Sequence, residues 1–212
     1  MHAVEVVIPV KAFRIAKSRL TGLPHRDDLA RAMVLDTLTA VCAVVDRVVL
    51  VSDEPELASL VQAAGIDGPV EFLADPGAGL NAAIRAGDAH LGALRPGWLR
   101  IAMVADLPTI RPQDVQQVLT EARPHPRSLV VDAEGTGTTM LLSGQGSLRP
   151  HFGRDSARHH RADGAVALTE VDPRARRDVD TADDLGGVLR LGPGPHTGAV
   201  LSRDALRARL RM

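Results

Sequence analysis

The chain has 212 residues and a formal net charge of −1, from 25 basic and 26 acidic side chains. This balance excludes a general nucleic-acid binder, which needs a large positive field, and an aromatic content of 2% leaves little for stacking bases. A hydrophobic content of 45% is enough for a core in one ordinary domain. Because no apolar run is long enough to span a bilayer and the N-terminus does not resemble a signal peptide, we expect a cytoplasmic protein that binds no membrane.

Short apolar segments alternate with segments of helical periodicity along the chain. This alternation is typical of an α/β domain with a mainly parallel sheet and helices on both faces. Asp53 is expected to cap a helix that begins near Pro55. We expect strands at residues 5–10, 46–51, 70–73, 98–104, 129–131, 139–142 and 165–168, and helices at 29–45, after Pro55, at 80–94, after Pro112 and at 181–191.

The C-terminal residues differ from the rest of the chain. Glycine and proline at residues 192–196 predict a turn, and residues 202–211 resemble a short basic helix. We therefore expect one domain over residues 1–191, with residues 192–212 forming a turn and a short tail packed on it. The single cysteine, Cys42, excludes an internal disulfide and gives no zinc pattern.

Both lysines of the chain, Lys11 and Lys17, lie in the loop after the first expected strand, while the other 23 of the 25 basic residues are arginine. A lysine is a compact charge on a flexible stem, which suits the oxygens of a moving phosphate group. With Arg14 and Arg19, the loop can surround a triphosphate and stabilise a departing pyrophosphate. The alternative is a solvated basic loop. The glycine patterns of P-loop and dinucleotide-binding proteins are absent from the sequence.

Two acidic positions are candidates for holding a metal. Asp106 follows the strand expected at residues 98–104, and ligands of parallel sheets bind beyond the carboxyl ends of the strands. Magnesium favours one or two carboxylates together with phosphate oxygens and water, although a turn aspartate is the alternative. Helix capping explains Asp180 but leaves Asp178 without a structural role. We therefore predict Asp178 as the second ligand, with Asp180 open as its substitute.

Two further loops favour anion binding. Residues 135–139 are rich in glycine and hydroxyl groups, so their backbone amides can approach an anion closely. Residues 151–160 combine glycine, serine and arginine at an expected helix start. Together these loops predict a site for a small acidic acceptor, although each alone is typical of an ordinary turn. The histidines at 151, 159 and 160 are expected to be exposed basic groups, not zinc ligands.

An ordered set of motifs in the chain resembles one known family, the 2-phospho-L-lactate or phosphoenolpyruvate guanylyltransferases of coenzyme F420 biosynthesis. The resemblance covers nearly the whole chain and implies a nucleotidyltransferase-type Rossmann-like fold. The motifs that carry it are Pro9-Val10-Lys11, Ala16-Lys17-Ser18-Arg19-Leu20, Gly79-Leu80-Asn81, Asp106-Leu107-Pro108, Gly135-Thr136-Gly137-Thr138, Phe152-Gly153-Arg154-Asp155-Ser156, Asp178-Val179-Asp180-Thr181 and Leu191-Gly192-Pro193-Gly194-Pro195-His196-Thr197.

The family implies that GMP is transferred from GTP to a small phosphorylated three-carbon acid, with release of pyrophosphate. The acceptor brings its own phosphate as the nucleophile, so alignment and charge neutralisation are the main tasks of the protein. Carried over by position, Thr138, Gly153 and Ser156 would bind the acid, Asp106 and Asp178 would hold Mg²⁺, Lys11, Lys17 and Arg19 would face the GTP phosphates, and Leu80 and Asn81 would contact the nucleotide.

The arginine- and alanine-rich composition indicates a high-GC source, and the actinobacterial branch of the family is associated with phosphoenolpyruvate. The resemblance therefore favours phosphoenolpyruvate over 2-phospho-L-lactate and 3-phosphoglycerate as the acid. The alternatives are a nucleotidyltransferase acting on a sugar phosphate or on molybdopterin, and a domain that binds a nucleotide without catalysis. Hand-over of the product to the next enzyme of the pathway and a homodimer are further expectations.

Overall fold

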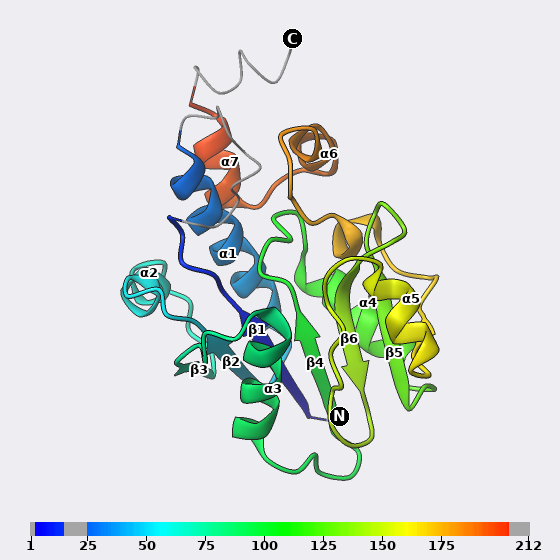
Figure 1. Ribbon diagram of the computed structural model, residues 1–212. Helices are drawn as coiled ribbons and strands as arrows, with labels where there is room; N and C mark the ends of the chain where they lie inside the picture. Colours follow the sequence, from blue (N-terminus) through cyan, green and yellow to red (C-terminus); the bar gives the residue numbers. More distant parts are fainter. Residues whose placement is uncertain (1–2, 15–24, 204–212) are drawn as a thin grey trace.

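The computed structural model of the protein describes residues 3–14 and 25–203, and a seven-stranded sheet forms its centre (Figure 1). The order across the sheet is β3-β2-β1-β4-β6-β5-β7. The strands are β1 (Val4–Pro9), β2 (Arg47–Val51), β3 (Val70–Leu73), β4 (Leu99–Met103), β5 (Arg127–Val131), β6 (Thr138–Ser143) and β7 (Val166–Ala167). Of these described strands, only β6 runs antiparallel to its neighbours, β4 and β5. The expectation of a mainly parallel sheet is therefore confirmed.

Helices cover both faces of the sheet, as the apolar strands require. Side chains alternate between the faces, so Val6 and Ile8 of β1 join one core with α1, α2 and α4, while Val7 joins another with α3 and α5. The helices are α1 (Arg26–Cys42), α2 (Leu57–Ala63), α3 (Leu80–Leu91), α4 (Pro112–Ala122), α5 (Ser156–Ala162), α6 (Asp184–Leu191) and α7 (Pro195–Leu201), with a 3₁₀ turn, η1, at Pro173–Arg176. Within the described residues, none of these helices combines the length and the apolar character needed to cross a bilayer.

The segments that carry the predicted site residues meet at one edge of the sheet. Strands β1, β2, β4 and β5 end there, and the reversed strand β6 begins there. In the orientation of Figure 1 this is the upper edge, and α6 lies above the end of β4. Because ligands of such sheets bind beyond the carboxyl ends of the strands, this edge positions the candidate site.

The C-terminal elements pack against the first half of α1. Met33 of α1 forms a buried cluster with Leu185 of α6 and Val200 of α7. The carboxylate of Asp36 in α1 accepts the backbone N–H groups of His196 and Thr197 at 3.0 and 2.8 Å, which ties the start of α7 to the domain. Helix α7 was missed from the sequence, where only a turn was predicted at residues 192–196. Most of the basic helix expected at 202–211 lies outside the described residues.

The expected cap at Asp53 is wrong. Helix α2 begins at Leu57, two residues after Pro55, and no side chain caps its first turn. The Asp53 carboxylate accepts the backbone N–H of Asp75 at 3.1 Å instead, so it links two loops rather than starting a helix.

Candidate active site

The described part of the lysine loop is held against the end of β2. Lys11 is exposed, and Phe13, two residues later, is only 1% exposed in the core. The backbone N–H of Phe13 donates to Glu54 Oε2 at 2.8 Å, and the Ser52 hydroxyl donates to the Val10 carbonyl at 2.6 Å. These contacts fix Lys11 at the carboxyl edge of the sheet. Lys17 and Arg19 lie outside the described residues, so their roles stay predictions.

Asp106 lies in the loop that follows β4, and a hydrogen bond to α1 holds this loop in place. The buried hydroxyl of Thr37 accepts the backbone N–H of Leu107 at 3.0 Å and donates to the Met33 carbonyl at 2.8 Å. On the other side, the backbone N–H of Gly194 donates to the Pro108 carbonyl at 2.7 Å. The candidate metal ligand is therefore carried by a loop that is pinned to two helices.

Asp178 is brought close to Asp106. Burial raises the pKa of the Asp178 carboxyl to about 8, and the negative charges of Asp106, Asp180 and Asp132 add to the shift. The segment that carries Asp178 is not a strand; it follows η1, whose Ala175 carbonyl accepts the Thr139 hydroxyl at 2.7 Å. An acidic pair that is predicted from positions 72 residues apart thus meets at one edge of the sheet.

Asp180 takes a more open position. It is exposed, and its backbone N–H donates to Asp184 Oδ2 at 3.0 Å, as do the backbone N–H and the hydroxyl of Thr181. Asp184, the first residue of α6, therefore organises the turn before that helix. Asp178 is half-buried, and among the charged neighbours Asp106 makes the largest contribution to its raised pKa.

The residues present fit a hard divalent cation. Carboxylates crowded at one place repel one another, and a bound cation relieves that repulsion. In residues 3–14 and 25–203, no group of three or more carboxylate, histidine or cysteine side chains is arranged around a metal position. Magnesium is commonly held by one or two carboxylates, with phosphate oxygens and waters as the other ligands, and the pair Asp106 and Asp178 matches that arrangement.

The three residues assigned to the acid acceptor also come together. Thr138 is the first residue of β6 and Ser156 the first residue of α5, and the Ser156 hydroxyl donates to Thr138 Oγ1 at 3.1 Å. The exposed Gly153 has a φ of 125°, which favours glycine, and its carbonyl accepts the Ser156 N–H at 3.2 Å. Thr138 and Ser156 are 6% and 1% exposed, so little of either side chain is open to solvent.

The loop that precedes Thr138 is shaped by Asp132, at the end of β5. Its carboxylate accepts the backbone N–H groups of Thr136 and Gly137 at 3.0 and 2.7 Å. A Cβ at Gly137 would overlap the Asp132 carboxylate, so a larger residue there would displace that carboxylate. This tight loop places Thr138 on the same edge as Asp106, since β4 and β6 are paired through the bond from Val104 N to the Thr139 carbonyl at 3.0 Å.

Asn81 is engaged in a way that the sequence did not indicate. Its amide group donates to the Phe152 carbonyl and accepts the Phe152 N–H, both at 2.8 Å, so it ties the start of α3 to the turn containing Gly153. The neighbouring Leu80, the first residue of α3, packs against the core. Contact of Leu80 and Asn81 with a nucleotide stays a prediction.

The expectation of exposed histidines is wrong for His160, which is fully buried, and holds for His151 and His159. His160 Nδ1 lies 3.0 Å from Thr138 Oγ1, and the backbone N–H of His151 donates to His160 Nε2 at 2.8 Å. Burial, aided by His151 and Arg127, lowers the pKa of His160 to about 4, so the ring is neutral near pH 7. The signal in the sequence was its spacing of four residues from Ser156, which places both on one face of α5.

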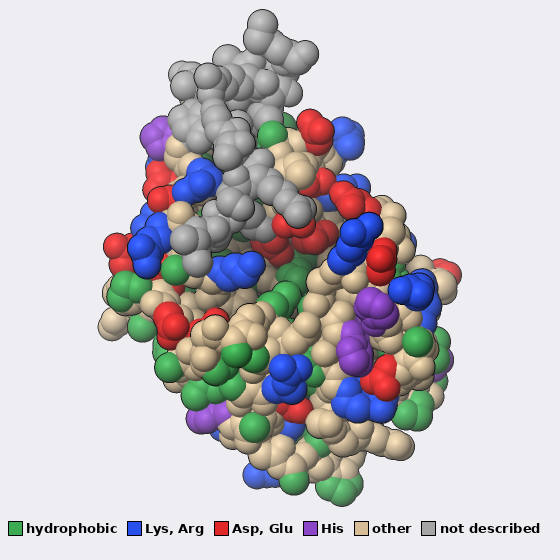
Figure 2. Space-filling model, in the orientation of Figure 1, with side chains coloured by type: hydrophobic (Ala, Val, Ile, Leu, Met, Phe, Trp, Pro, Cys, Tyr) green, Lys and Arg blue, Asp and Glu red, His purple; other side chains and the backbone are tan. Residues whose placement is uncertain are grey.

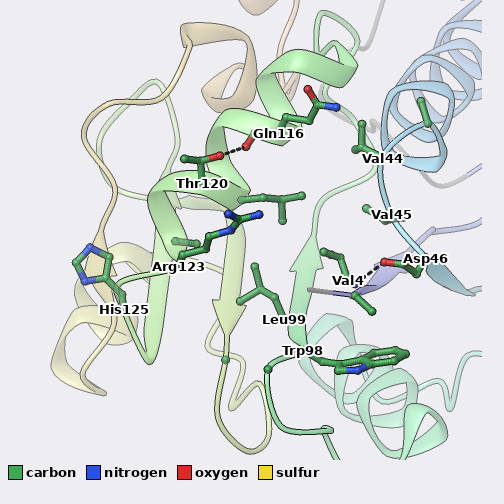
Figure 3. Close-up of a pocket in the computed structure, with 16 residues that line it drawn as sticks. Val4, Val44, Val45, Asp46, Trp98, Leu99, Gln116, Thr120, Arg123 and His125 are labelled. Carbon is green, nitrogen blue, oxygen red and sulfur yellow. Dashed lines mark hydrogen bonds between the residues drawn. The ribbon is translucent and has the colours of Figure 1, made fainter. Parts of the chain in front are cut away.

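A separate pocket of about 770 Å³ lies at the opposite edge of the sheet (Figure 3). It is lined by residues at the amino ends of β1 and β4, among them Val4, Trp98 and Leu99, and by α4 residues such as Gln116 and Thr120. None of the residues predicted for the active site lines it. On the face drawn in Figure 2, by contrast, acidic side chains gather beside a central hollow and basic side chains flank it.

Several solved structures share this fold. A nucleotide-diphospho-sugar transferase from Desulfovibrio desulfuricans G20 is similar with a TM-score of 0.69 at 17% identity, over 99% of both chains. The Rv0371C protein of Mycobacterium tuberculosis H37Rv, solved in complex with manganese, gives a TM-score of 0.51 at 21% identity, over 90% of this chain and 99% of that one. The chain therefore shares its fold with these proteins.

The family follows from the sequence comparisons. The chain belongs to the family described as "Guanylyl transferase CofC like", whose model matches residues 4–208. Among its relatives, the phosphoenolpyruvate guanylyltransferase of Salinispora arenicola is 45% identical over 94% of both chains. The enzyme of the same name from Geodermatophilus obscurus is 40% identical over 97% of both chains. The resemblance drawn from the motifs is therefore confirmed.

Proposed function

We propose that the protein transfers GMP from GTP to phosphoenolpyruvate, as a cytoplasmic step of coenzyme F420 biosynthesis. The observation that carries the proposal is the meeting, at one sheet edge, of the carboxylates of Asp106 and Asp178 with the hydroxyl pair of Thr138 and Ser156. An edge of this kind can serve a nucleoside triphosphate and a small anionic acceptor at once. The relatives are named phosphoenolpyruvate guanylyltransferases, which supports phosphoenolpyruvate as the acid and GTP as the GMP donor.

The reaction needs few chemical groups from the protein. A phosphate oxygen of phosphoenolpyruvate forms a bond to the α-phosphorus of GTP, the bond from that phosphorus to the bridging oxygen breaks, and pyrophosphate leaves with the electron pair. The acceptor phosphate is already ionised near pH 7, so no serine, cysteine or strong general base has to activate it. Alignment of the two substrates and compensation of their charges are the remaining tasks.

The residues divide these tasks between the two substrates. Lys11, Lys17 and Arg19 face the GTP phosphates and offset the charge of the leaving pyrophosphate. Asp106 and Asp178 are the residues that would hold Mg²⁺. When bound, the ion neutralises phosphate oxygens at the reacting centre. Thr138, Gly153 and Ser156 hold the acid, while Leu80 and Asn81 contact the nucleotide.

The test is to incubate the protein with GTP, Mg²⁺ and one acid at a time, and to measure pyrophosphate. The acids are phosphoenolpyruvate, 2-phospho-L-lactate and 3-phosphoglycerate. We expect the highest kcat/KM with phosphoenolpyruvate. Release with another acid but not with phosphoenolpyruvate would reassign the acceptor, and binding of GTP without release in any mixture would contradict enzymatic activity.

A further inference from the structure

His160 lies behind the hydroxyl pair that we assign to the acid acceptor. The imidazole is fully buried, and the ring of Phe152 packs edge-on against it at 5.2 Å between centroids. Both ring nitrogens have partners: Nδ1 lies 3.0 Å from Thr138 Oγ1, and Nε2 lies 2.8 Å from the backbone nitrogen of His151. A ring held at both nitrogens has one orientation and one place for its proton.

The partner at Nε2 fixes that place. A backbone N–H can only donate, so the contact from His151 requires an unprotonated Nε2. A neutral imidazole then carries its single hydrogen on Nδ1. Nδ1–H therefore donates to Thr138 Oγ1, and the hydroxyl oxygen is an acceptor in that contact.

This direction changes what the hydroxyl pair offers to a ligand. Thr138 and Ser156 bring two hydroxyl hydrogens, and one of them is used in the bond between the two oxygens at 3.1 Å. With Nδ1–H as a donor, the second hydrogen stays available for an incoming group, whichever of the two hydroxyls carries it. If Nδ1 were an acceptor, Thr138 would donate to it, Ser156 would donate to Thr138, and no hydrogen would remain.

We propose that His160 is a positioning residue, which holds one O–H of the Thr138–Ser156 pair as a donor toward an anionic oxygen of the acceptor acid. The inference rests on the proposed function, because it assumes that the acid binds at this pair. His160 does not touch the substrate. It acts by donating its Nδ1–H to the Thr138 oxygen, so that this hydroxyl does not donate to the imidazole. An anionic acid binds through hydrogen-bond donors. The free hydroxyl hydrogen of the Thr138–Ser156 pair therefore affects the affinity for the acid and not the affinity for GTP.

Two substitutions of matched size separate the donor function of the ring from its packing. The amide of His160→Asn can place an N–H where Nδ1 stands and so retains donation to Thr138. The amide of His160→Gln reaches the place of Nε2, retains the contact with the His151 N–H and loses donation to Thr138. Circular dichroism and the KM for GTP report on the integrity of each variant.

We expect His160→Gln to raise the KM for phosphoenolpyruvate by roughly 3- to 10-fold, because the Thr138 hydroxyl keeps its hydrogen but loses the neutral hydrogen bond that orients it toward the acid. The KM for GTP should stay within about twofold, and His160→Asn should recover most of the loss. Equal effects of the two variants, or a normal KM for the acid in a folded His160→Gln protein, would overturn the inference. Failure of the wild-type protein to release pyrophosphate with any acid would instead sink the proposed function.

The tautomer of His160 is a second readout, which does not depend on how well the variants fold. In a ¹⁵N-labelled wild-type protein, long-range correlations of the eight histidine rings distinguish protonated from unprotonated nitrogens. The pKa of about 4 means that the His160 ring should stay neutral down to about that pH. A protonated Nδ1 supports the inference, and a protonated Nε2 would overturn it.

Discussion

The hydroxyl of Thr37 accepts the backbone N–H of Leu107 at 3.0 Å, and this bond joins α1 to the loop that carries Asp106. Both residues are fully buried, with no exposed surface. The position of the proposed metal ligand Asp106 therefore depends on a side chain that lies 70 residues before its neighbour Leu107. A buried N–H that loses its acceptor is costly, so the contact can be tested through stability and through activity.

Thr37→Val keeps the shape of the side chain and removes the acceptor. We expect the free energy of unfolding to fall by about 1–3 kcal/mol, since the Leu107 N–H is left unpaired, and the Mg²⁺ concentration needed for half-maximal activity to rise. Urea denaturation and a Mg²⁺ titration measure the two effects. Thr37→Ser keeps the hydroxyl and serves as the control. A valine variant with wild-type stability and Mg²⁺ dependence would contradict this role.

Asp178 links the site to pH. Its carboxyl has a pKa of about 8 in the metal-free folded protein, against about 3.9 in an unfolded chain. Between these two pKa values, Asp178 is protonated in the folded state and ionised in the unfolded state. The contribution of Asp178 to the stability of the fold therefore falls as pH rises from about 4 to about 8. We expect Asp178→Asn to raise the Tm of the metal-free protein by about 5 °C at pH 8.5 and much less at pH 4.5, while guanylyl transfer is lost.

The control for this change is Asp67→Asn, which alters an exposed carboxylate far from the site in the sequence. It should leave the Tm within about 1 °C at both pH values, because surface substitutions usually change stability little. If Asp178→Asn lowered the Tm at pH 8.5, the acidic crowding that we assign to the site would be contradicted.

Asn81 offers a test of which substrate its side chain serves. Asn81→Ala removes both bonds to the Phe152 backbone, and we expect a loss of about 1–3 kcal/mol in stability and a higher KM for the acid. Asn81→Asp retains the bond from the Phe152 N–H and should lose less. Steady-state kinetics with each substrate varied in turn distinguish an effect of Asn81 on the acid site from a direct contact with the nucleotide. A change confined to the KM for GTP would favour the direct nucleotide contact predicted from the motif.

Gly194 and Gly198 form a matched pair for testing how α7 is attached. A Cβ at Gly194 would overlap the carboxylate of Asp36, whereas a Cβ at Gly198 would meet only Pro193 Cγ at 3.8 Å. We expect Gly194→Ala to lower the free energy of unfolding by about 1–3 kcal/mol through overpacking. Gly198→Ala, inside α7, should be neutral or stabilising by up to about 1 kcal/mol. Chemical denaturation of both variants measures this, and equal effects would contradict the assigned packing.

The sequence predicted the parts of this site that depend on strand ends. Lys11 and Asp106 follow apolar strands, and a parallel sheet necessarily brings such positions to one edge. The reversal of β6 and the burial of His160 could not be predicted in the same way, because both depend on partners that only the folded chain brings together. Helix α7 was missed for a similar reason: the acceptor for its first N–H groups is Asp36, 160 residues earlier in the chain.

The central claim, that this edge of the sheet transfers GMP to an acid, is tested most directly by following labelled phosphorus. The protein would be incubated with Mg²⁺, phosphoenolpyruvate and GTP that carries ³²P at either the α or the γ position. We predict that the α label moves into a new product containing the acid and that the γ label appears only in pyrophosphate. Transfer of the γ label to the acid, or GTP that binds and stays intact, would contradict the account.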